Sequence, residues 1–362
     1  MMNVNMTPAR KKFVEVAQAE FGEGEVLLQN EKDKIKYEIL KKKKEYIFNT
    51  ILNISKNPFQ LDLLNYQKDK KSLLELNLKA KKVINKNLIF DKISLKEKDN
   101  IILINDLVIS NDLKLENVKD INIDYIDREK LKNKIKLTKK NNNYFISGKS
   151  FNLNRIIDKL LNSKDNKQIQ FFNKDLKIII DIENVYLDKK NIINQLNGFL
   201  TFNKNKISEL NLESKFSNQE NIKFTIKNNG QEKITTLSSH QAKPFVDRYE
   251  FIKGFEEGNL DFYSIKKGDI SNSTLKIDNF KIQEIPALAK LLTLASLQGI
   301  ADLLTGEGIR FTDFEMKFSS KDNLMNISEI YAIGPAISIL MEGYIQKNKL
   351  ISLRGTLVPA TT

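Results

Sequence analysis

The sequence predicts a mainly β protein built on a long, twisted antiparallel sheet, and three observations lead to this fold class. Short segments alternate strictly between apolar and polar residues, which gives a strand one apolar face and one wet face. Polar turns rich in Asn and Lys separate these segments from about Gln60 to Val358. Long helical segments do not alternate with the strands, so a parallel doubly wound sheet is disfavoured.

Four segments carry the alternation most clearly. The residues that fall on one face of their segment are Leu176, Ile178, Ile180 and Ile182 in LKIIIDI, Ile222, Phe224 and Ile226 in NIKFTIK, Ile337, Ile339, Met341, Gly343 and Ile345 in AISILMEGYI, and Ile351, Leu353, Gly355 and Leu357 in LISLRGTLV. Polar residues at 68–71, 203–205 and 347–348 suit tight loops, so each site predicts a hairpin.

A few short helices are expected beside the strands. The segment TPARKKFVEVAQAEF predicts an N-terminal helix, because Thr7 can cap it, Pro8 suits its first turn and Gly22 follows its end. Residues 151–162 predict a second helix, with Asn154 as its cap and an apolar stripe behind it. Residues 243–255 predict a third, which begins near a proline and ends near a glycine.

The most apolar stretch of the chain runs from Ile285 to Gly308 and predicts a further helix at about 285–304. Lys290 and Asp302 lie inside it, and each ionised group at bilayer depth costs about 2.5–3.5 kcal/mol, so a membrane span is disfavoured. The helix is expected to cap the sheet; lying on a membrane surface or gating an apolar groove are the alternatives. Its packing stripe comprises Leu288, Leu292, Ala295, Gly299 and Leu303.

Composition argues against several functional classes. The chain has 362 residues, no Cys and one His, so thiolate chemistry is excluded, and no metal or other cofactor is expected. Carboxylates at 247–250 and 313–315 lack an accompanying nucleophile and base, which disfavours an enzyme.

The net charge of +13 comes from the first part of the chain. From Gln241 onward there are 14 Lys and Arg against 15 Asp and Glu, which leaves 45 against 31 in the first 240 residues. These lysines are scattered among acids and asparagines, and the densest run, Lys41–Lys44, has no aromatic interleaving and no glycine loop. A solvated basic face is therefore favoured over nucleic-acid binding.

Three segments are expected along the chain. Residues 1–150 would hold the N-terminal helix and a β-meander, and residues 151–240 a short helix with hairpins of the same sheet. Residues 241–362 would form a C-terminal region with capping helices at 243–255 and 285–304.

A long sheet with one apolar face must hide that face in a barrel, a sandwich or a curled trough. The trough, a hydrophobic groove, is favoured, and an acyl chain is its natural ligand. The expected lining residues are Ile178, Ile180, Ile222, Phe224, Ile226, Ile337, Ile339, Met341, Leu353 and Leu357. The alternative for each of them is a place in a closed core.

The C-terminal third carries a specific series of motifs. GFEEGNLDFYS is followed by a strand containing DNF, by IPALAKLLTLASLQG, by LTGEGIRF, by GPAI and by a closing GTLVPA. Over residues 241–360 this order closely resembles the C-terminal region of AsmA-like proteins of the large YhdP type.

The resemblance implies a bridge-like lipid-transfer protein with a long β-sheet rolled into a groove for phospholipid acyl chains. It also implies a periplasmic location, an N-terminal anchor in the inner membrane and a role in envelope integrity. This chain shows no such anchor and stops at GTLVPATT, so we expect it to be a fragment of a longer chain or the product of a truncated gene model. The alternative function is a structural or assembly protein of the envelope that binds protein partners by strand addition.

Overall fold

A computed structural model of the chain describes residues 11–14, 17–29, 31–42, 44–83, 86–111, 114–157, 175–203, 206–249, 254–283, 308–346 and 350–359. These residues are mainly β, with a few short helices, which confirms the predicted fold class. The chain divides into two units, Met1–Lys206 and Ile207–Thr362. We call them unit 1 and unit 2, and the expected segment limits at 150 and 240 fall inside them.

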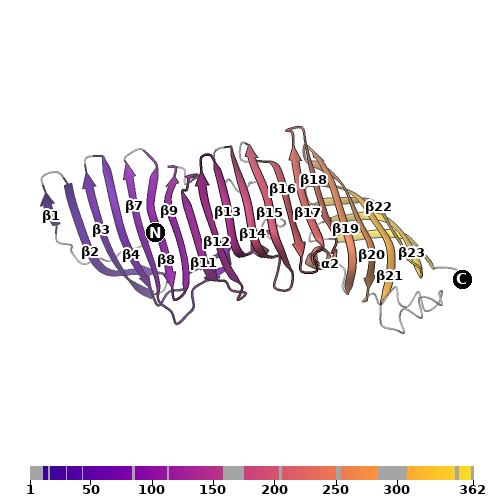
Figure 1. Ribbon diagram of the computed structural model, residues 1–362, viewed down its shortest axis with the longest axis horizontal. Helices are drawn as coiled ribbons and strands as arrows, with labels where there is room; N and C mark the ends of the chain where they lie inside the picture. Colours follow the sequence, from indigo (N-terminus) through magenta and orange to yellow (C-terminus); the bar gives the residue numbers. More distant parts are fainter. Residues whose placement is uncertain are drawn as a thin grey trace. The chain divides into compact units, whose positions relative to one another are not determined.

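Unit 1 is an open sheet whose strands lie side by side almost entirely in chain order (Figure 1). The neighbours are antiparallel with one exception, and β9 pairs with both β10 and β11. Its strands are β1 (Lys11–Val14), β2 (Ala17–Leu28), β3 (Glu31–Lys42), β4 (Glu45–Ile54), β7 (Leu74–Val83), β8 (Leu88–Glu97), β9 (Asn100–Ile109), β10 (Leu115–Asn117), β11 (Asp120–Ile126), β12 (Lys132–Lys140), β13 (Asn143–Asn152), β14 (Leu176–Tyr186) and β15 (Ile192–Asn203).

The exception is the parallel pair β13–β14, in which Ile146 lies opposite Ile180. Parallel neighbours need a long crossover connection, and residues 153–175 supply it. The helix expected at 151–162 begins here, at residues 154–157, while Phe151 and Asn152 still belong to β13. The remainder of that expected helix lies outside the described residues.

The N-terminal helix expected from Thr7 is wrong in its described part, because Lys11–Val14 and Ala17–Leu28 are strands. Residues Gln18 to Leu28 of β2 pair with β3 along their whole length. Strand pairing of this length outweighs the local residue preferences that favour a helix. Gly22 does not end a helix. It lies opposite Tyr37, whose ring occupies the space that a Cβ at Gly22 would need.

The hairpin expected with a turn at 68–71 is also wrong. A small separate hairpin forms instead, in which β5 (Gln60–Leu61) pairs with β6 (Tyr66–Gln67) around the 3₁₀ turn η1 (Asp62–Leu64). Asn65 takes the left-handed backbone at the end of this turn, and the long strand resumes only at Leu74, paired with β4.

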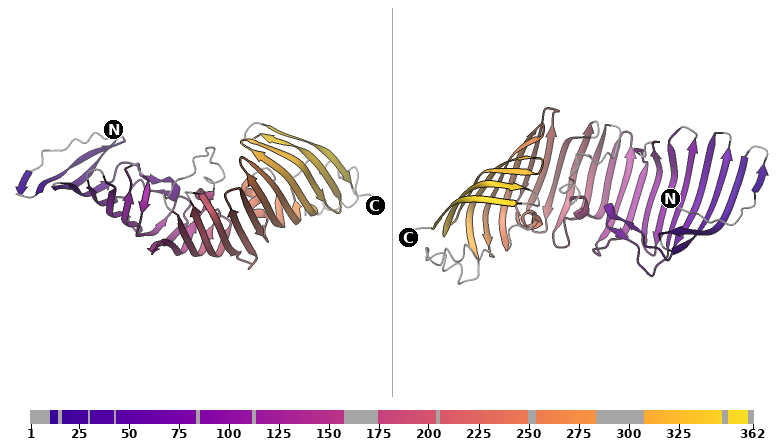
Figure 2. Two further views of the ribbon diagram at one scale, coloured as in Figure 1. Left: turned by 90° about the horizontal axis from the view of Figure 1, so that it is seen from above. Right: turned by 180° about the vertical axis from the view of Figure 1, so that it is seen from behind.

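Unit 2 is a curled antiparallel sheet in chain order from β16 to β24 (Figure 2). Figure 2 shows its last strands turned across the direction of its earlier ones. Among the described residues of unit 2, β16 pairs with β17 alone and β24 with β23 alone, so the sheet that they form does not close on itself. Its strands are β16 (Lys206–Phe216), β17 (Asn221–Asn228), β18 (Glu232–Ser239), β19 (Phe255–Lys267), β20 (Ile270–Ile282), β21 (Ile309–Lys321), β22 (Leu324–Ile333), β23 (Ile337–Gln346) and β24 (Leu350–Pro359).

Two of the predicted hairpins and one predicted helix fall in or beside this unit. The strands on either side of 347–348 pair as expected, with Gln346 opposite Leu350, while the turn itself lies outside the described residues. At the hairpin predicted with a turn at 203–205, β15 ends at Asn203 and β16 begins at Lys206. The residues between them lie outside the described part of the chain. The helix expected at 243–255 is shorter, with α2 (Lys243–Val246) and η2 (Asp247–Tyr249), and Phe255 already belongs to β19.

Candidate functional site

The strongest candidate site is one face of the unit 2 sheet, which we call the unit 2 apolar face. Its central row crosses eight strands through residues that lie directly opposite one another. In order from β17 to β24 this row is Phe224, Leu237, Phe262, Leu275, Met316, Ile330, Met341 and Gly355. Every side chain in it is apolar, and each strand adds its member because apolar and polar residues alternate along it.

Two further rows flank the central one on the same face. The first contains Ile222, Ser239, Leu260, Ile277, Phe314, Ala332, Ile339 and Leu357, and the second contains Ile226, Thr235, Ser264, Ser273, Phe318, Ile327, Gly343 and Leu353. Each of the three rows thus starts at a predicted lining residue of β17. The structure places seven of the predicted lining residues in these rows, and Ile337 lies at the start of β23 on the same face.

One end of this face is a closed core under α2. Phe280 stacks between Phe255 and Phe311, with ring centroids 5.1 and 5.2 Å apart. Val246 of α2 packs into the same cluster, and all four side chains are buried. The short helix therefore covers the apolar face only where the aromatic side chains are most deeply packed.

The predicted lining residues on this face differ in exposure. Ile222, Ile226 and Ile337 are buried, whereas Phe224, Ile339 and Met341 are half-buried. On β24 Leu353 is 40% and Leu357 37% exposed. The first three of these predicted residues therefore lie in a closed core, while the others are half-buried or exposed.

Unit 1 has an apolar face of the same construction. One cross-strand row contains Ile35, Leu52, Leu76, Leu95, Ile102, Ile123, Ile135, Gly148, Ile182 and Leu196. Ile178 and Ile180 lie on this face, half-buried, with Ile180 beside Ile146. The β5–β6 hairpin covers one end of the face, where Tyr66 packs edge-on against Tyr125 at 5.6 Å.

The opposite face of unit 2 carries mostly polar side chains on β17–β21, several of them in ion pairs, and we call this part the polar face. On β22–β24 the same side also carries exposed apolar side chains, among them Ile333, Leu340 and Val358. Glu315 accepts bonds from Lys276 and Lys317, both at 3.0 Å, and these two lysines lower the pKa of the carboxyl. Glu329 and Glu315 together raise the pKa of Lys317 to about 12. Of the carboxylates at 313–315 that the sequence offered as possible catalytic groups, Glu315 is therefore held ionised by two ammonium groups. Glu250, from the other set at 247–250, lies outside the described residues.

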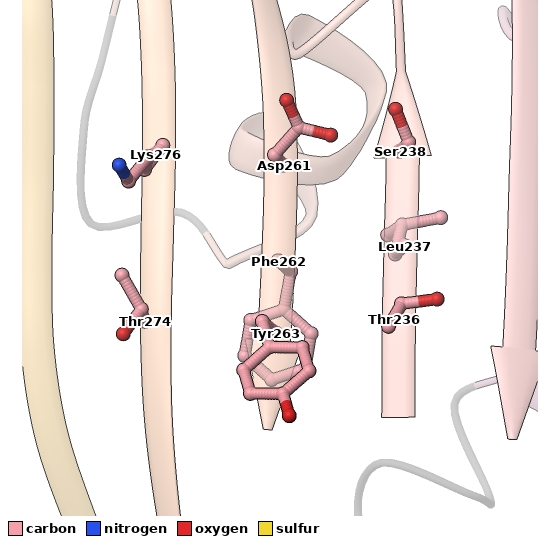
Figure 3. A pocket seen from close by; sticks show the side chains of 8 residues that line it. All are labelled: Thr236, Leu237, Ser238, Asp261, Phe262, Tyr263, Thr274 and Lys276. Atoms are coloured by element: carbon pink, nitrogen blue, oxygen red, sulfur yellow. The ribbon is translucent and has the colours of Figure 1, made fainter. Parts of the chain in front are cut away.

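An open pocket of about 310 Å³ lies around Tyr263 on this polar face (Figure 3). Tyr263 is 45% exposed and lies between Thr236 and Thr274 of the neighbouring strands. Asp261 and Lys276 line the next row of the pocket. Ser238, opposite Asp261 on the neighbouring strand, also lines it.

The described residues contain no group of three or more His, Cys, Asp or Glu side chains placed to hold a metal ion. No helix among them is both long and apolar enough to cross a bilayer. The predicted capping helix, with Leu288, Leu292, Ala295, Gly299 and Leu303, lies outside them.

Sequence reasoning missed most of the middle of the unit 2 apolar face. Leu237, Phe262 and Leu275 were not among the expected lining residues, although they occupy its central row. The alternation in GNLDFYS, with Leu260 and Phe262 two apart, was a sufficient signal for the second of these.

Comparisons of the chain with protein-family models, with curated proteins and with solved structures found no match. The resemblance to AsmA-like proteins therefore stays a prediction from the motifs.

Proposed function

We propose that this protein is a non-enzymatic lipid-transfer protein, which shields phospholipid acyl chains along the apolar faces of its sheets. The observation that carries the proposal is the uninterrupted central row of unit 2, which crosses eight successive strands without a polar side chain and is half-buried over most of its length. An exposed apolar surface of this extent normally has a partner or ligand.

The shape of this surface suits an extended chain better than a compact ligand. Neighbouring strands are about 4.8 Å apart, so a row over eight strands offers a track longer than a single acyl chain. Each methylene taken from water onto such a track contributes about 0.8 kcal/mol. Binding would thus be passive and largely independent of lipid identity along the tail.

The proposal places the protein in the periplasm, where a longer form anchored in the inner membrane would support lipid movement toward the outer membrane and envelope integrity. Only the motif resemblance supports this placement. The apolar faces support the acyl-chain ligand independently of it.

The test uses two neighbouring positions on opposite faces of β24. Leu357 lies on the apolar face and Val358 on the other, and they are 37% and 55% exposed. The chain has no Cys, so Leu357→Cys and Val358→Cys each introduce a single thiol for a benzophenone label. We expect the label at position 357 to crosslink co-purified phospholipid, seen by native mass spectrometry and solvent extraction, and the label at 358 to give little product.

Equal crosslinking at both positions would indicate non-specific adsorption of lipid. A folded protein that carries no lipid and crosslinks none at either position would overturn the proposal.

A second function is favoured by the edge strand β24. Its outer side has no partner among the described residues of unit 2, and Ile351 and Val358 are 61% and 55% exposed. Strand addition by an envelope protein is the expected use of such an edge. Lipid-free protein whose β24 amides become protected from hydrogen exchange on adding a partner protein would favour this assembly function.

A further inference from the structure

The unit 2 apolar face changes character along strands β18, β19 and β20, away from α2. Leu237, Phe262 and Leu275 form the apolar row, and the next row is Thr235, Ser264 and Ser273. The row after that is Lys233, Lys266 and Ser271. The same face is therefore apolar, then hydroxyl-bearing, then cationic over four residues of strand, about 13 Å.

The two lysines at the end of this gradient lie directly opposite each other on neighbouring strands. Like charges in this position destabilise a sheet. Lys233 is half-buried, and burial, followed by repulsion from Lys266, lowers its pKa. No carboxylate among the described residues pairs with either lysine. Glu232, next in sequence, lies on the other face and binds Lys267 at 3.1 Å.

Three lysines on the polar face of the same unit differ from this pair. There Lys223, Lys276 and Lys317 each have a carboxylate within 3.0 Å. Among the described lysines of β17–β21, the pair on the apolar face thus concentrates positive charge that the chain itself does not neutralise, next to serines. Ser273 donates to Ser264 at 2.8 Å, which leaves the Ser264 hydroxyl proton free to donate.

We propose that Lys233 and Lys266 form an anion site for the phosphate of a phospholipid whose acyl chains lie along the neighbouring apolar rows. This inference rests on the proposed lipid-binding function and adds the position and chemistry of the headgroup. Ammonium groups bind phosphate by charge-assisted hydrogen bonds, and the Thr235–Ser264–Ser273 row faces the ester-linked glycerol region. The order phosphate, ester and tail in the lipid matches the order of the three rows.

The test compares ligands that share parts of this chemistry, using the full chain and calorimetry. The ligands are dihexanoyl-phosphatidylglycerol, dihexanoylglycerol, which lacks the phosphate, and inorganic phosphate. The variant is Lys233→Gln/Lys266→Gln, and the control is Lys223→Gln/Lys276→Gln, which removes the same charge from the polar face. We expect wild type and control to bind the phospholipid about tenfold or more tightly than the diacylglycerol, and the variant to lose this preference.

A second readout separates a ligand site from a structural pair. Because the facing charges repel each other, the variant is expected to unfold at a higher urea concentration than wild type without lipid, while binding the phospholipid more weakly. A variant that unfolds earlier and keeps the phospholipid preference would overturn the headgroup site but leave acyl-chain binding intact. Inorganic phosphate binding as tightly as the phospholipid would show a free-anion site instead. Failure of both lipids to bind wild type would overturn the proposed function itself.

Discussion

Asp33 shows how one side chain holds two segments of unit 1 together. Its carboxylate is 1% exposed and accepts bonds from the backbone amides of Ser55 and Lys56, at 2.8 and 3.0 Å, and from the Asn57 side chain at 2.8 Å. Burial alone would raise the pKa of Asp33, but these bonds outweigh it and lower the pKa to about 2. The carboxylate therefore fixes the chain as it leaves β4.

We expect Asp33→Asn to lower the free energy of unfolding by about 1–3 kcal/mol at pH 7, because an amide cannot accept all of these bonds. The pKa is depressed in the folded state, so this stabilisation is complete above the unfolded-state value of about 3.9 and is lost as the pH falls toward about 2. Urea unfolding at pH 7 and at several values below 4 measures it.

The control is Asp91→Asn, which removes an exposed ion pair with Lys81 at 3.1 Å and should cost at most about 1 kcal/mol. A gap between wild type and Asp33→Asn that stays constant down to pH 2 would contradict the role of the ionised carboxylate.

At the scale of elements, the pairing of β12 with β13 depends on one glycine. The register shifts between Lys134 and Ile135, and Gly148 lies opposite Ile135 at this bulge. A Cβ on Gly148 would lie 2.3 Å from the Lys134 carbonyl oxygen, which is backbone and cannot move aside cheaply. Gly24, in β2, has no atom within 4 Å of the corresponding position.

We expect Gly148→Ala to destabilise the protein by about 1–3 kcal/mol through overpacking. Gly24→Ala should be neutral or stabilise by up to about 1 kcal/mol, because the unfolded chain loses freedom and the folded strand has room. The midpoints of urea unfolding measure both changes. Equal effects of the two substitutions would show that the close approach at the bulge does not limit the pairing.

For the whole molecule, a ligand that binds only the folded apolar face must stabilise the fold. We expect dihexanoyl-phosphatidylglycerol, kept below its micelle concentration, to raise the free energy of unfolding by about 2.7 kcal/mol at one hundred times its dissociation constant. Ile339→Asp, which puts a charge on the apolar face, should abolish this rise.

The matched control is Leu340→Asp, one residue along β23 on the opposite face and 54% exposed, which should keep the rise. Loss of lipid stabilisation in both variants, with both still folded, would mean that the apolar face is not where the lipid binds. Urea unfolding followed by circular dichroism at several lipid concentrations decides this.

The sequence by itself determined that the protein is β and which residues of a strand share a face. Alternation is local, so Ile222, Phe224 and Ile226 could be placed on one face before any neighbour was known. The prediction of an N-terminal helix was wrong because capping residues are also a local signal, and the pairing of β2 with β3 outweighed it.

The tertiary structure alone decided which strands lie side by side and in what register. Nothing local marks β14 as parallel to β13, or sets Lys233 opposite Lys266, since those positions are 33 residues apart and meet only when β18 and β19 pair. Register also decided which predicted residues became core and which stayed open, because burial depends on neighbouring strands and on where α2 lies. The candidate site is thus a property of pairing across the sheet, built from faces that each strand already specified.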